Sequence, residues 1–496
     1  MSNASVPEYH TAIIGAGFSG IGTAIKLDEA GFHDYVILEA GDRAGGTWYW
    51  NTYPGVAVDV PSFSYQFSFE QRKDWSRTYA LGHELQAYAE HCADKYGIRS
   101  KIRFNTTVLR AVFDESNDLW RLELRSGEQI TARFVVNAAG AFYTPNIPDI
   151  DGVDGFGGVT MHTARWDHSQ DLTGKRVAII GTGASAVQVI PTIAPQVEKL
   201  TVFQRTPIWC FPKPDTAMPR LARWLMRIPG GMAIQRVLSQ IYVELTLPLP
   251  GQYATTLRLT RWTQAVGKAY LRREVRDPVV RDKLTPRYVV GCKRPGFHSG
   301  YLSTYNRDNV ELVTDGIDKI TPTGIATVTG EHREVDALIL ATGFKVMDVD
   351  SLSYEVAGRG GQTLRGFWEQ NRMQAYEGVS VPGFPNFFTV VGPYGFVGGS
   401  WFTMIETQTH HILRCLNRAR ERGATLVEVS EAANKRYFDE MMRKRHTQIF
   451  WHPSCQNANS YYFDSNGDAP VRRAASFETI WRSRRFPLSD YEFSAR

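Results

Sequence analysis

The stretch that decides the fold is residues 9–20, YHTAIIGAGFSG, near the start of a chain of 496 residues. Its first part, Tyr9 to Gly15, is short and mostly apolar and stops at glycine, which predicts a buried β-strand. Gly15 permits a tight turn, Gly17 lets the backbone approach a pyrophosphate, and Gly20 lets a helix pack closely on the strand. We expect that helix over residues 20–30. The stretch therefore predicts the phosphate-binding turn of a dinucleotide site.

A second predicted strand, residues 35–39 (YVILE), completes a βαβ unit and ends on Glu39. A carboxylate at that position accepts hydrogen bonds from ribose hydroxyls and repels a ribose phosphate. The amide hydrogens at the N-terminus of the intervening helix attract phosphate oxygens. This first site is therefore suited to the adenosine of FAD or NAD.

The same pattern returns in the middle of the chain, at residues 176–186 (RVAIIGTGASA). Its turn residues are expected to hold a second nucleotide, with alanine at the last glycine position, which the pattern permits; they are Gly181, Thr182, Gly183 and Ser185. The strand 199–203 closes this unit, and Gln204-Arg205 follow it in place of an acid. Arginine can donate two hydrogen bonds to a 2′-phosphate, so we predict NADPH here. The alternative is that Arg205 is an ordinary surface cation.

Two such units predict an α/β protein with two Rossmann-like dinucleotide-binding domains, one for FAD and one for NADPH. We expect the first part of the FAD-binding domain at residues 1–150 and the NADPH-binding domain at 151–343. The second part of the FAD-binding domain, with a loop region for substrate and NADP, is expected at 344–496. Residues 214–285 lack strand-like alternation and predict a helical insertion. Substrate would bind where these parts meet.

The composition argues against several classes of protein. A net charge of +5 is small for this length and gives no reason to expect a nucleic-acid partner. The N-terminus does not resemble a signal peptide, and no stretch approaches the roughly 20 apolar residues that span a bilayer. The five cysteines form no close pair and no metal-ligand spacing, which favours a reducing compartment and no metal site. We therefore expect a soluble, cytoplasmic protein.

The predicted helical insertion is rich in arginine and also carries Trp224. Its basic residues include Arg220, Arg223, Arg227 and Arg236. One interpretation is a peripheral helix at a membrane surface. We favour the simpler one, a lid or an oligomer face whose arginines are solvated.

Two dinucleotide units imply hydride transfer from nicotinamide to flavin, but they do not say where the electrons go next. A disulfide reductase needs a pair of cysteines soon after the FAD turn. Residues 45–55, GGTWYWNTYPG, contain no cysteine. Dioxygen is the default acceptor for a flavin without such a relay.

Two further motifs resemble those of the type I Baeyer–Villiger monooxygenases, which are flavin monooxygenases. The motif Phe-x-Gly-x-x-x-His-x-x-x-Trp followed by Pro or Asp is complete here, as Phe156, Gly158, His162, Trp166 and Asp167. A second family pattern runs without a gap from Gly45 to Asp59. The resemblance covers nearly the whole chain. It implies that FAD, NADPH and O2 oxidise a ketone to an ester or lactone through a C4a-peroxyflavin.

The resemblance also implies which residues are catalytic. Arg294 would stabilise the negative charge of a flavin peroxide and of the oxyanion formed on the ketone. Asp59 would hold Arg294 through a charge-assisted hydrogen bond. Lys293 would join Arg205 around the 2′-phosphate; without the resemblance, Lys293-Arg294 is a solvated basic pair. Further cofactor contacts are expected from Gly46, Thr47 and Trp48.

Other segments complete this interpretation. His162 is expected to couple the domains rather than transfer protons, although an isolated histidine is more often a satisfied linker or core residue. Residues 384–388 (FPNFF) resemble the family's return strand beneath the flavin ring. Tyr461 stands where tryptophan is usual, which leaves the contact of that loop with NADP open. His410-His411 predicts a surface pair on a helix, not a metal site.

Two alternative functions remain. An N- or S-oxygenating flavin monooxygenase shares the predicted fold, but Arg294 and Asp59 favour a ketone as the substrate. The other alternative is a flavoprotein that oxidises or senses NADPH without oxygenating a substrate. The expected partners are a ketone and O2, and the sequence indicates neither the ketone nor the oligomeric state.

Overall fold

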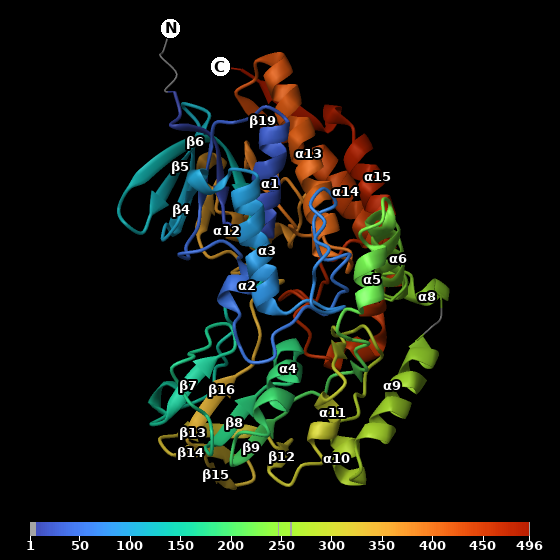
Figure 1. Ribbon diagram of the computed structural model, residues 1–496. Coiled ribbons are helices and arrows are strands. Elements are labelled where there is room, and N and C mark those ends of the chain that lie inside the picture. The colour runs from blue at the N-terminus through green and yellow to red at the C-terminus, as the bar shows by residue number, and fades with distance from the viewer. Residues whose placement is uncertain (1–5, 247, 258–259, 496) are drawn as a thin grey trace.

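The computed structural model describes residues 6–246, 248–257 and 260–495, and it confirms the α/β fold. It has two main sheets, of which the first is mixed and the second parallel. The first sheet lies at one end of the molecule and the second at the other, as Figure 1 shows. The strand order of the first sheet is β17 (Glu355–Ala357), β4 (Val108–Asp114), β5 (Leu119–Leu124), β6 (Gln129–Asn137), β1 (Tyr9–Ile14), β2 (Tyr35–Leu38) and β3 (Ile102–Arg103), with β18 (Phe387–Thr389) paired to β6.

The predicted βαβ unit forms the centre of the first sheet. β1 pairs in parallel with β2 on one side and β6 on the other. The connecting helix, α1 (Phe18–Glu29), packs against α13 (Trp401–Arg422) from the far end of the chain. The predicted return strand is present as β18, in parallel with β6. Strands from both ends of the chain thus share one sheet, which supports the proposed split of the FAD-binding domain; its boundaries remain predictions.

The second sheet is parallel throughout. Its order is β12 (Val310–Val313), β9 (Lys199–Phe203), β8 (Arg176–Ile180), β16 (Ala337–Leu340) and β7 (Val159–His162). The second glycine turn joins β8 to α4 (Ala184–Ile193). A small antiparallel sheet of β13 (Ile317–Thr321), β14 (Gly324–Thr327) and β15 (His332–Glu334) precedes β16. Short strands thus occupy much of residues 310–340.

The insertion is helical, as predicted. It comprises α5 (Arg220–Leu225), α6 (Gly231–Thr246), α7 (Pro248–Gln252), α8 (Ala254–Leu257), α9 (Thr260–Glu274) and α10 (Pro278–Lys283). The parallel pair β10 (Cys210–Phe211) and β11 (Gly296–Phe297) brackets it, so the chain leaves and returns at nearly one place. Within the described ranges, no helix combines the length and apolar content needed to cross a membrane.

We call the parts of the molecule built around the first and the second sheet the two lobes. α11 (Tyr301–Thr304) packs against α4 and α9 in the second lobe. The remaining helices of the first lobe are α2 (Thr47–Trp50), α3 (Gly82–Lys95), α12 (Leu364–Asn371), α14 (Glu431–Lys444) and α15 (Ser476–Arg485). The last strands, β19 (Leu426–Val429) and β20 (Tyr491–Ser494), form an antiparallel pair.

The prediction of a surface histidine pair on α13 is wrong for one of the two residues. His410 is exposed, but His411 is buried, stacks on Phe486 with ring centroids 3.6 Å apart, and shares a 2.7 Å hydrogen bond with the Tyr491 hydroxyl. Successive residues of a helix point in different directions, so only one faces solvent. No metal-binding cluster of His, Cys, Asp or Glu occurs in the part of the chain that the structure describes.

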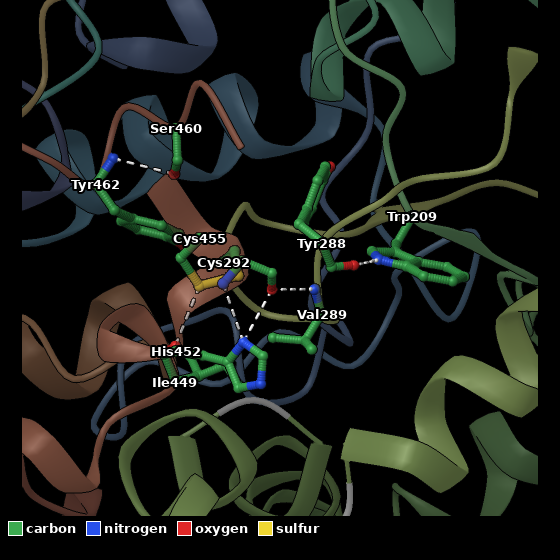
Figure 2. Close-up of a disulfide and its surroundings, with 10 residues drawn as sticks. Trp209, Tyr288, Val289, Cys292, Ile449, His452, Cys455, Ser460 and Tyr462 are labelled. Atoms are coloured by element: carbon green, nitrogen blue, oxygen red, sulfur yellow. Dashed lines mark hydrogen bonds between the residues drawn. A yellow bond between two sulfur atoms is a disulfide. The ribbon is translucent and has the colours of Figure 1, made fainter. Parts of the chain in front are cut away.

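The interpretation of the cysteines also needs correction. Cys292 and Cys455 form a disulfide although 163 residues separate them, whereas Cys92, Cys210 and Cys415 are free and buried. Figure 2 shows the bond between the segment that precedes Lys293 and a C-terminal loop. A hydrogen bond of 3.1 Å from the Val289 amide to Ser454 Oγ lies beside it. Spacing along the chain cannot reveal such a pair. The prediction of a reducing, cytoplasmic compartment rested on unpaired cysteines, and the disulfide removes that argument.

We expect the disulfide to restrain the loop that follows Cys455. Reduction, or the change Cys455→Ala, should increase the rate of chymotrypsin cleavage at Tyr461–Phe463 by at least about tenfold, because local opening controls cleavage. Mass spectrometry of the fragments measures this rate. Cys292→Ala removes the same bond and should give the same rate. Cleavage of both variants at the wild-type rate would show that the loop is held without the disulfide.

Candidate active site

A cavity of about 1280 Å³ joins the two predicted nucleotide sites. Both glycine turns line it, and so do the segments that carry Asp59, Arg294 and Tyr461. A cavity of this size at the junction of two nucleotide-binding units is suited to large cofactors and a small substrate. The residues that the sequence analysis selects from distant parts of the chain therefore meet around one space.

The first glycine turn is packed too closely against backbone atoms to admit side chains. Gly15 has a φ of +104°, and a Cβ there would lie 2.8 Å from the Ala138 carbonyl oxygen. Gly20 is closest to the strand, since a Cβ would lie 1.9 Å from the Gly15 carbonyl oxygen. Gly17 packs on Gly46, whose own Cβ would lie 2.8 Å from the Gly17 Cα. α1 has no side-chain cap and no acid in its first turn, so its free amides face the cavity ready for an anion.

Glu39 ends β2 as predicted, and its carboxylate is buried. Its two oxygens accept hydrogen bonds from the amides of Ala16 (2.6 Å) and Gly41 (2.8 Å). Burial raises the pKa of Glu39, and these backbone bonds oppose that effect. The carboxylate thus holds the glycine turn in place and also lines the cavity, as Thr47 and Trp48 do.

The second turn offers a similar cradle for a nucleotide. Gly181 has a φ of +113°, and a Cβ there would lie 2.4 Å from the Ala341 carbonyl oxygen. At Gly183 a Cβ would meet no protein atom within 4 Å, yet the residue lines the cavity. The protein itself therefore does not require glycine at 183, whereas a ligand lying against the backbone would. α4 begins there without a side-chain cap or an acid in its first turn, and Thr182 Oγ1 and Ser185 complete the turn.

Two cations lie together at the end of this second site. Arg205 is exposed and lines the cavity with Lys293. Burial, and then the nearby charge of Arg205, lowers the pKa of Lys293 to about 8. Among the described residues, neither cation forms an ion pair with a carboxylate. An uncompensated pair of cations fits a doubly charged phosphate.

Arg294 and Asp59 form a bidentate ion pair. The Nε and Nη2 atoms of Arg294 each donate a 2.8 Å hydrogen bond to one carboxylate oxygen of Asp59. Burial alone would raise the pKa of Asp59, but the charge and hydrogen bonds of Arg294 hold it below its usual value. Burial would likewise lower the pKa of Arg294, and Asp59 raises it well above its usual value. Both groups are therefore charged at neutral pH.

The structure identifies two residues near this pair that the sequence analysis missed. Gln188 of α4 accepts a hydrogen bond from the Tyr53 hydroxyl and bonds both backbone groups of Ala57, which fixes the approach to Asp59. Lys213 is buried and its charge acts on Asp59. Burial lowers the pKa of Lys213. Neither residue belongs to a motif, so only the fold could bring them to notice.

The segment that follows β7 contacts the lobe built around the first sheet. The Arg165 guanidinium lies 4.2 Å from the centre of the Trp50 ring, and His168 Nε2 is 2.8 Å from Thr52 Oγ1. His162 is buried beside Phe344, and burial lowers its pKa to about 4. It is neutral at physiological pH, which argues against proton transfer as its task.

The other members of the motif that contains His162 have local roles. A Cβ at Gly158 would lie 2.4 Å from the Asp336 carbonyl oxygen, so only glycine fits. Phe156 and Trp166 pack against buried clusters of the second lobe. Asp167 accepts hydrogen bonds from the amide and hydroxyl of Ser169, which turn the chain after the motif.

The C-terminal loop 459–463 closes the cavity next to Arg294. Asn459 Nδ2 donates a 2.7 Å hydrogen bond to Thr206 Oγ1, next to Arg205. Burial raises the pKa of Tyr461 well above its usual value, so its hydroxyl stays protonated and can donate. The disulfide at Cys455 ties this loop to the segment that carries Lys293 and Arg294 (Figure 2).

Comparisons with known proteins agree with this geometry. Residues 12–224 match the family described as pyridine nucleotide-disulphide oxidoreductase, although a redox cysteine pair is missing after the first turn. The chain is 36% identical to a Baeyer–Villiger monooxygenase of Streptomyces coelicolor over 97% of its own length and 92% of that protein.

Solved structures extend the similarity to the whole fold. The structure of OTEMO in complex with FAD and NADP matches with a TM-score of 0.87 at 29% identity, over 99% of this chain and 100% of that one. Cyclohexanone monooxygenase from Rhodococcus sp. Phi1, bound to NADP+, matches with a TM-score of 0.89 at 28% identity and the same coverage. This chain therefore belongs to the Baeyer–Villiger monooxygenase family.

Proposed function

We propose that Arg294 is the catalytic residue of an FAD- and NADPH-dependent monooxygenase that converts ketones to esters or lactones. The observation that carries this assignment is the bidentate pair with Asp59 inside the shared cavity. FAD would be held by the first glycine turn, Gly46 and Trp48, and NADPH by the second turn, Arg205 and Lys293. The chemistry that the bound flavin supplies is oxidation of NADPH and activation of O2.

The task of Arg294 follows from its surroundings. Nε and Nη2 are occupied by Asp59, and Nη1 has no hydrogen-bond partner among the described residues. A fixed donor with a permanent charge can stabilise the negative charge that develops on a ketone oxygen when the carbonyl is attacked. Asp59 is a positioning residue, because it sets the orientation of the guanidinium without facing the ketone itself. An oxygenation at nitrogen or sulfur develops no such oxyanion.

We expect Arg294→Ala to separate reduction from oxygenation. NADPH should still reduce FAD in a stopped-flow experiment, whereas the rate of ester formation should fall about a hundredfold, or roughly 3 kcal/mol in barrier. The consumed O2 should then appear as hydrogen peroxide. Asp59→Ala should fail in the same direction and less severely, and Arg294→Lys, which keeps the charge without the forked geometry, should lie between.

Oxygen uptake, peroxide release and product formation, measured with and without a panel of ketones, amines and sulfides, distinguish the alternatives. An NADPH oxidase would release peroxide with every ketone in the panel. An N- or S-oxygenating enzyme would form products only from amines or sulfides. Ester formation by Arg294→Ala at near-normal coupling would remove Arg294 from the mechanism.

Recognition of the 2′-phosphate is assigned to Arg205 and Lys293. Arg205→Ala should raise the KM for NADPH by about ten- to a hundredfold, the effect of losing charge-assisted hydrogen bonds, and leave the KM for NADH nearly unchanged. Arg287→Ala is the control, because that side chain is 88% exposed in the same lobe. An equal rise in both KM values would contradict the assignment.

Lys293 adds a pH dependence to the same experiment. With a pKa of about 8, Lys293 is cationic below that pH and neutral above it. The kcat/KM for NADPH should therefore decrease as the pH rises through 8, whereas the value for NADH should not. Lys293→Met should abolish the difference between the two profiles.

His162 is assigned to coupling between the lobes. His162→Ala should retain FAD but lower kcat by about ten- to a hundredfold, since small displacements of bound reactants are costly. The pH profile of kcat should keep its shape, because His162 is neutral throughout the range near pH 7. His446→Ala, an exposed histidine, serves as the control. Loss of FAD from His162→Ala would indicate a structural role instead.

A further inference from the structure

Helix α6 of the insertion is amphipathic, but its apolar side faces outward. Its outer residues lie three or four positions apart, which places them on one side of the helix. They are Ile234, Val237, Leu238, Ile241, Tyr242 and Leu245, each between 42% and 64% exposed. The inner side is partly polar: Arg236 donates a 3.0 Å hydrogen bond to the Gln66 carbonyl, and Ser239 Oγ donates one of 3.0 Å to Ser64 Oγ. A helix that faces only water has the opposite arrangement.

Two neighbouring helices continue this surface. α5 and the turn after it repeat the same spacing with four exposed apolar residues, which are Leu221, Trp224, Leu225 and Ile228. α15 adds Phe477 and Trp481, which are 69% and 56% exposed. The Ser476 amide at the start of α15 donates a 2.9 Å hydrogen bond to Glu244 of α6, so the two helices are in contact. Figure 1 shows α5, α6 and α15 together along one edge of the molecule. We call this surface the outer apolar face.

The exposed charges that α5, the turn after it and α15 bring to the outer apolar face are positive. Arg223, Arg227, Arg484 and Arg485 are exposed on α5, on the turn after it and on α15. The acids of these helices are turned inward: Glu244 accepts from Ser476, and Glu478 accepts from the Tyr253 hydroxyl. Over residues 216–273 the sequence contains nine lysines and arginines and one acidic residue. The face is therefore apolar in its middle and cationic at its margin.

This combination distinguishes between possible occupants. A second copy placed on the face would bring arginines of both copies together, and like charges repel. A lid would need to cover the apolar residues, but they remain exposed with α5 to α10 all in place. A lipid surface with anionic head groups satisfies both features, because the apolar side chains enter the acyl boundary and the arginines meet phosphate.

We propose that the outer apolar face binds the surface of a membrane that contains anionic lipid, with α6 lying in the plane of the interface. This revises the preference for a lid or an oligomer face that the sequence alone supports. The inference does not depend on the catalytic assignment, since it uses no residue of the cavity. It requires no spanning segment, because an interfacial helix is held by one side only.

Flotation of the FAD-loaded enzyme with lipid vesicles tests the proposal. We expect it to float with phosphatidylcholine vesicles that contain phosphatidylglycerol and to stay behind with phosphatidylcholine alone, and added salt should weaken binding. Leu238→Glu/Ile241→Glu should reduce the bound fraction by at least about tenfold, because two charges would enter the acyl boundary. Arg223→Gln/Arg227→Gln should reduce binding to the anionic vesicles by about tenfold or more.

The matched control is Val279→Glu/Val328→Glu. It makes the same change of charge at apolar residues that are 63% and 67% exposed on other elements. This control should bind vesicles as the wild type does. Because the substituted side chains are exposed, we expect all variants to fold. Retention of FAD by each variant checks this.

Several outcomes would overturn the proposal. The wild-type enzyme could fail to float with the anionic vesicles, or Leu238→Glu/Ile241→Glu could float as well as the control. A third contrary result is a dimer in analytical ultracentrifugation that this double change dissociates, without any vesicle binding. The last result would show that a second copy covers the outer apolar face.

Discussion

The ion pair between Arg294 and Asp59 is the contact on which the site depends. It joins residues 235 positions apart, one from each lobe, and it lies in a largely buried cavity wall. Removing two charges from water is costly, and only good geometry with further hydrogen bonds repays that cost. The two 2.8 Å hydrogen bonds supply the geometry, and Gln188 holds the chain that leads to Asp59. Loss of either partner would leave a buried charge, which is why the pair fixes the junction of the lobes.

The sequence predicts the parts of this structure that local rules control. The glycines of both turns have positions where a Cβ would collide with backbone, as at Gly20 and Gly181, so their spacing carries structural information. The buried strands β1 and β8 are short apolar runs that end at these turns. The helical insertion was recognisable because it lacks alternation. Arg294 and Asp59 came from a family resemblance, since a lysine-arginine pair and a lone aspartate have no distinctive local pattern.

The parts that sequence reasoning missed depend on contacts between distant segments. The disulfide links Cys292 to Cys455. Lys213, which precedes the helical insertion in the chain, acts on Asp59 together with Arg294, which follows the insertion. His411 is buried because α13 packs under Phe486 and Tyr491, which follow it by many residues. The direction of α6 is a similar case: its apolar residues recur at helical spacing, but that spacing does not show which side of the helix meets the protein. Periodicity defines a face, and only tertiary packing decides what that face contacts.

Charge compensation separates the two cationic groups of the cavity. Arg294 has Asp59 as a built-in counterion, so it stays charged and oriented whether or not a ligand is bound. Arg205 and Lys293 have no such counterion among the described residues, and their mutual repulsion contributes to the low pKa of Lys293. A phosphate between them would relieve that repulsion and favour the protonated form of Lys293. Part of the affinity for a 2′-phosphate therefore comes from the repulsion between Arg205 and Lys293 in the free protein. The first group is therefore suited to catalysis, which needs a fixed charge, and the second to binding, which gains from a charge that the ligand completes.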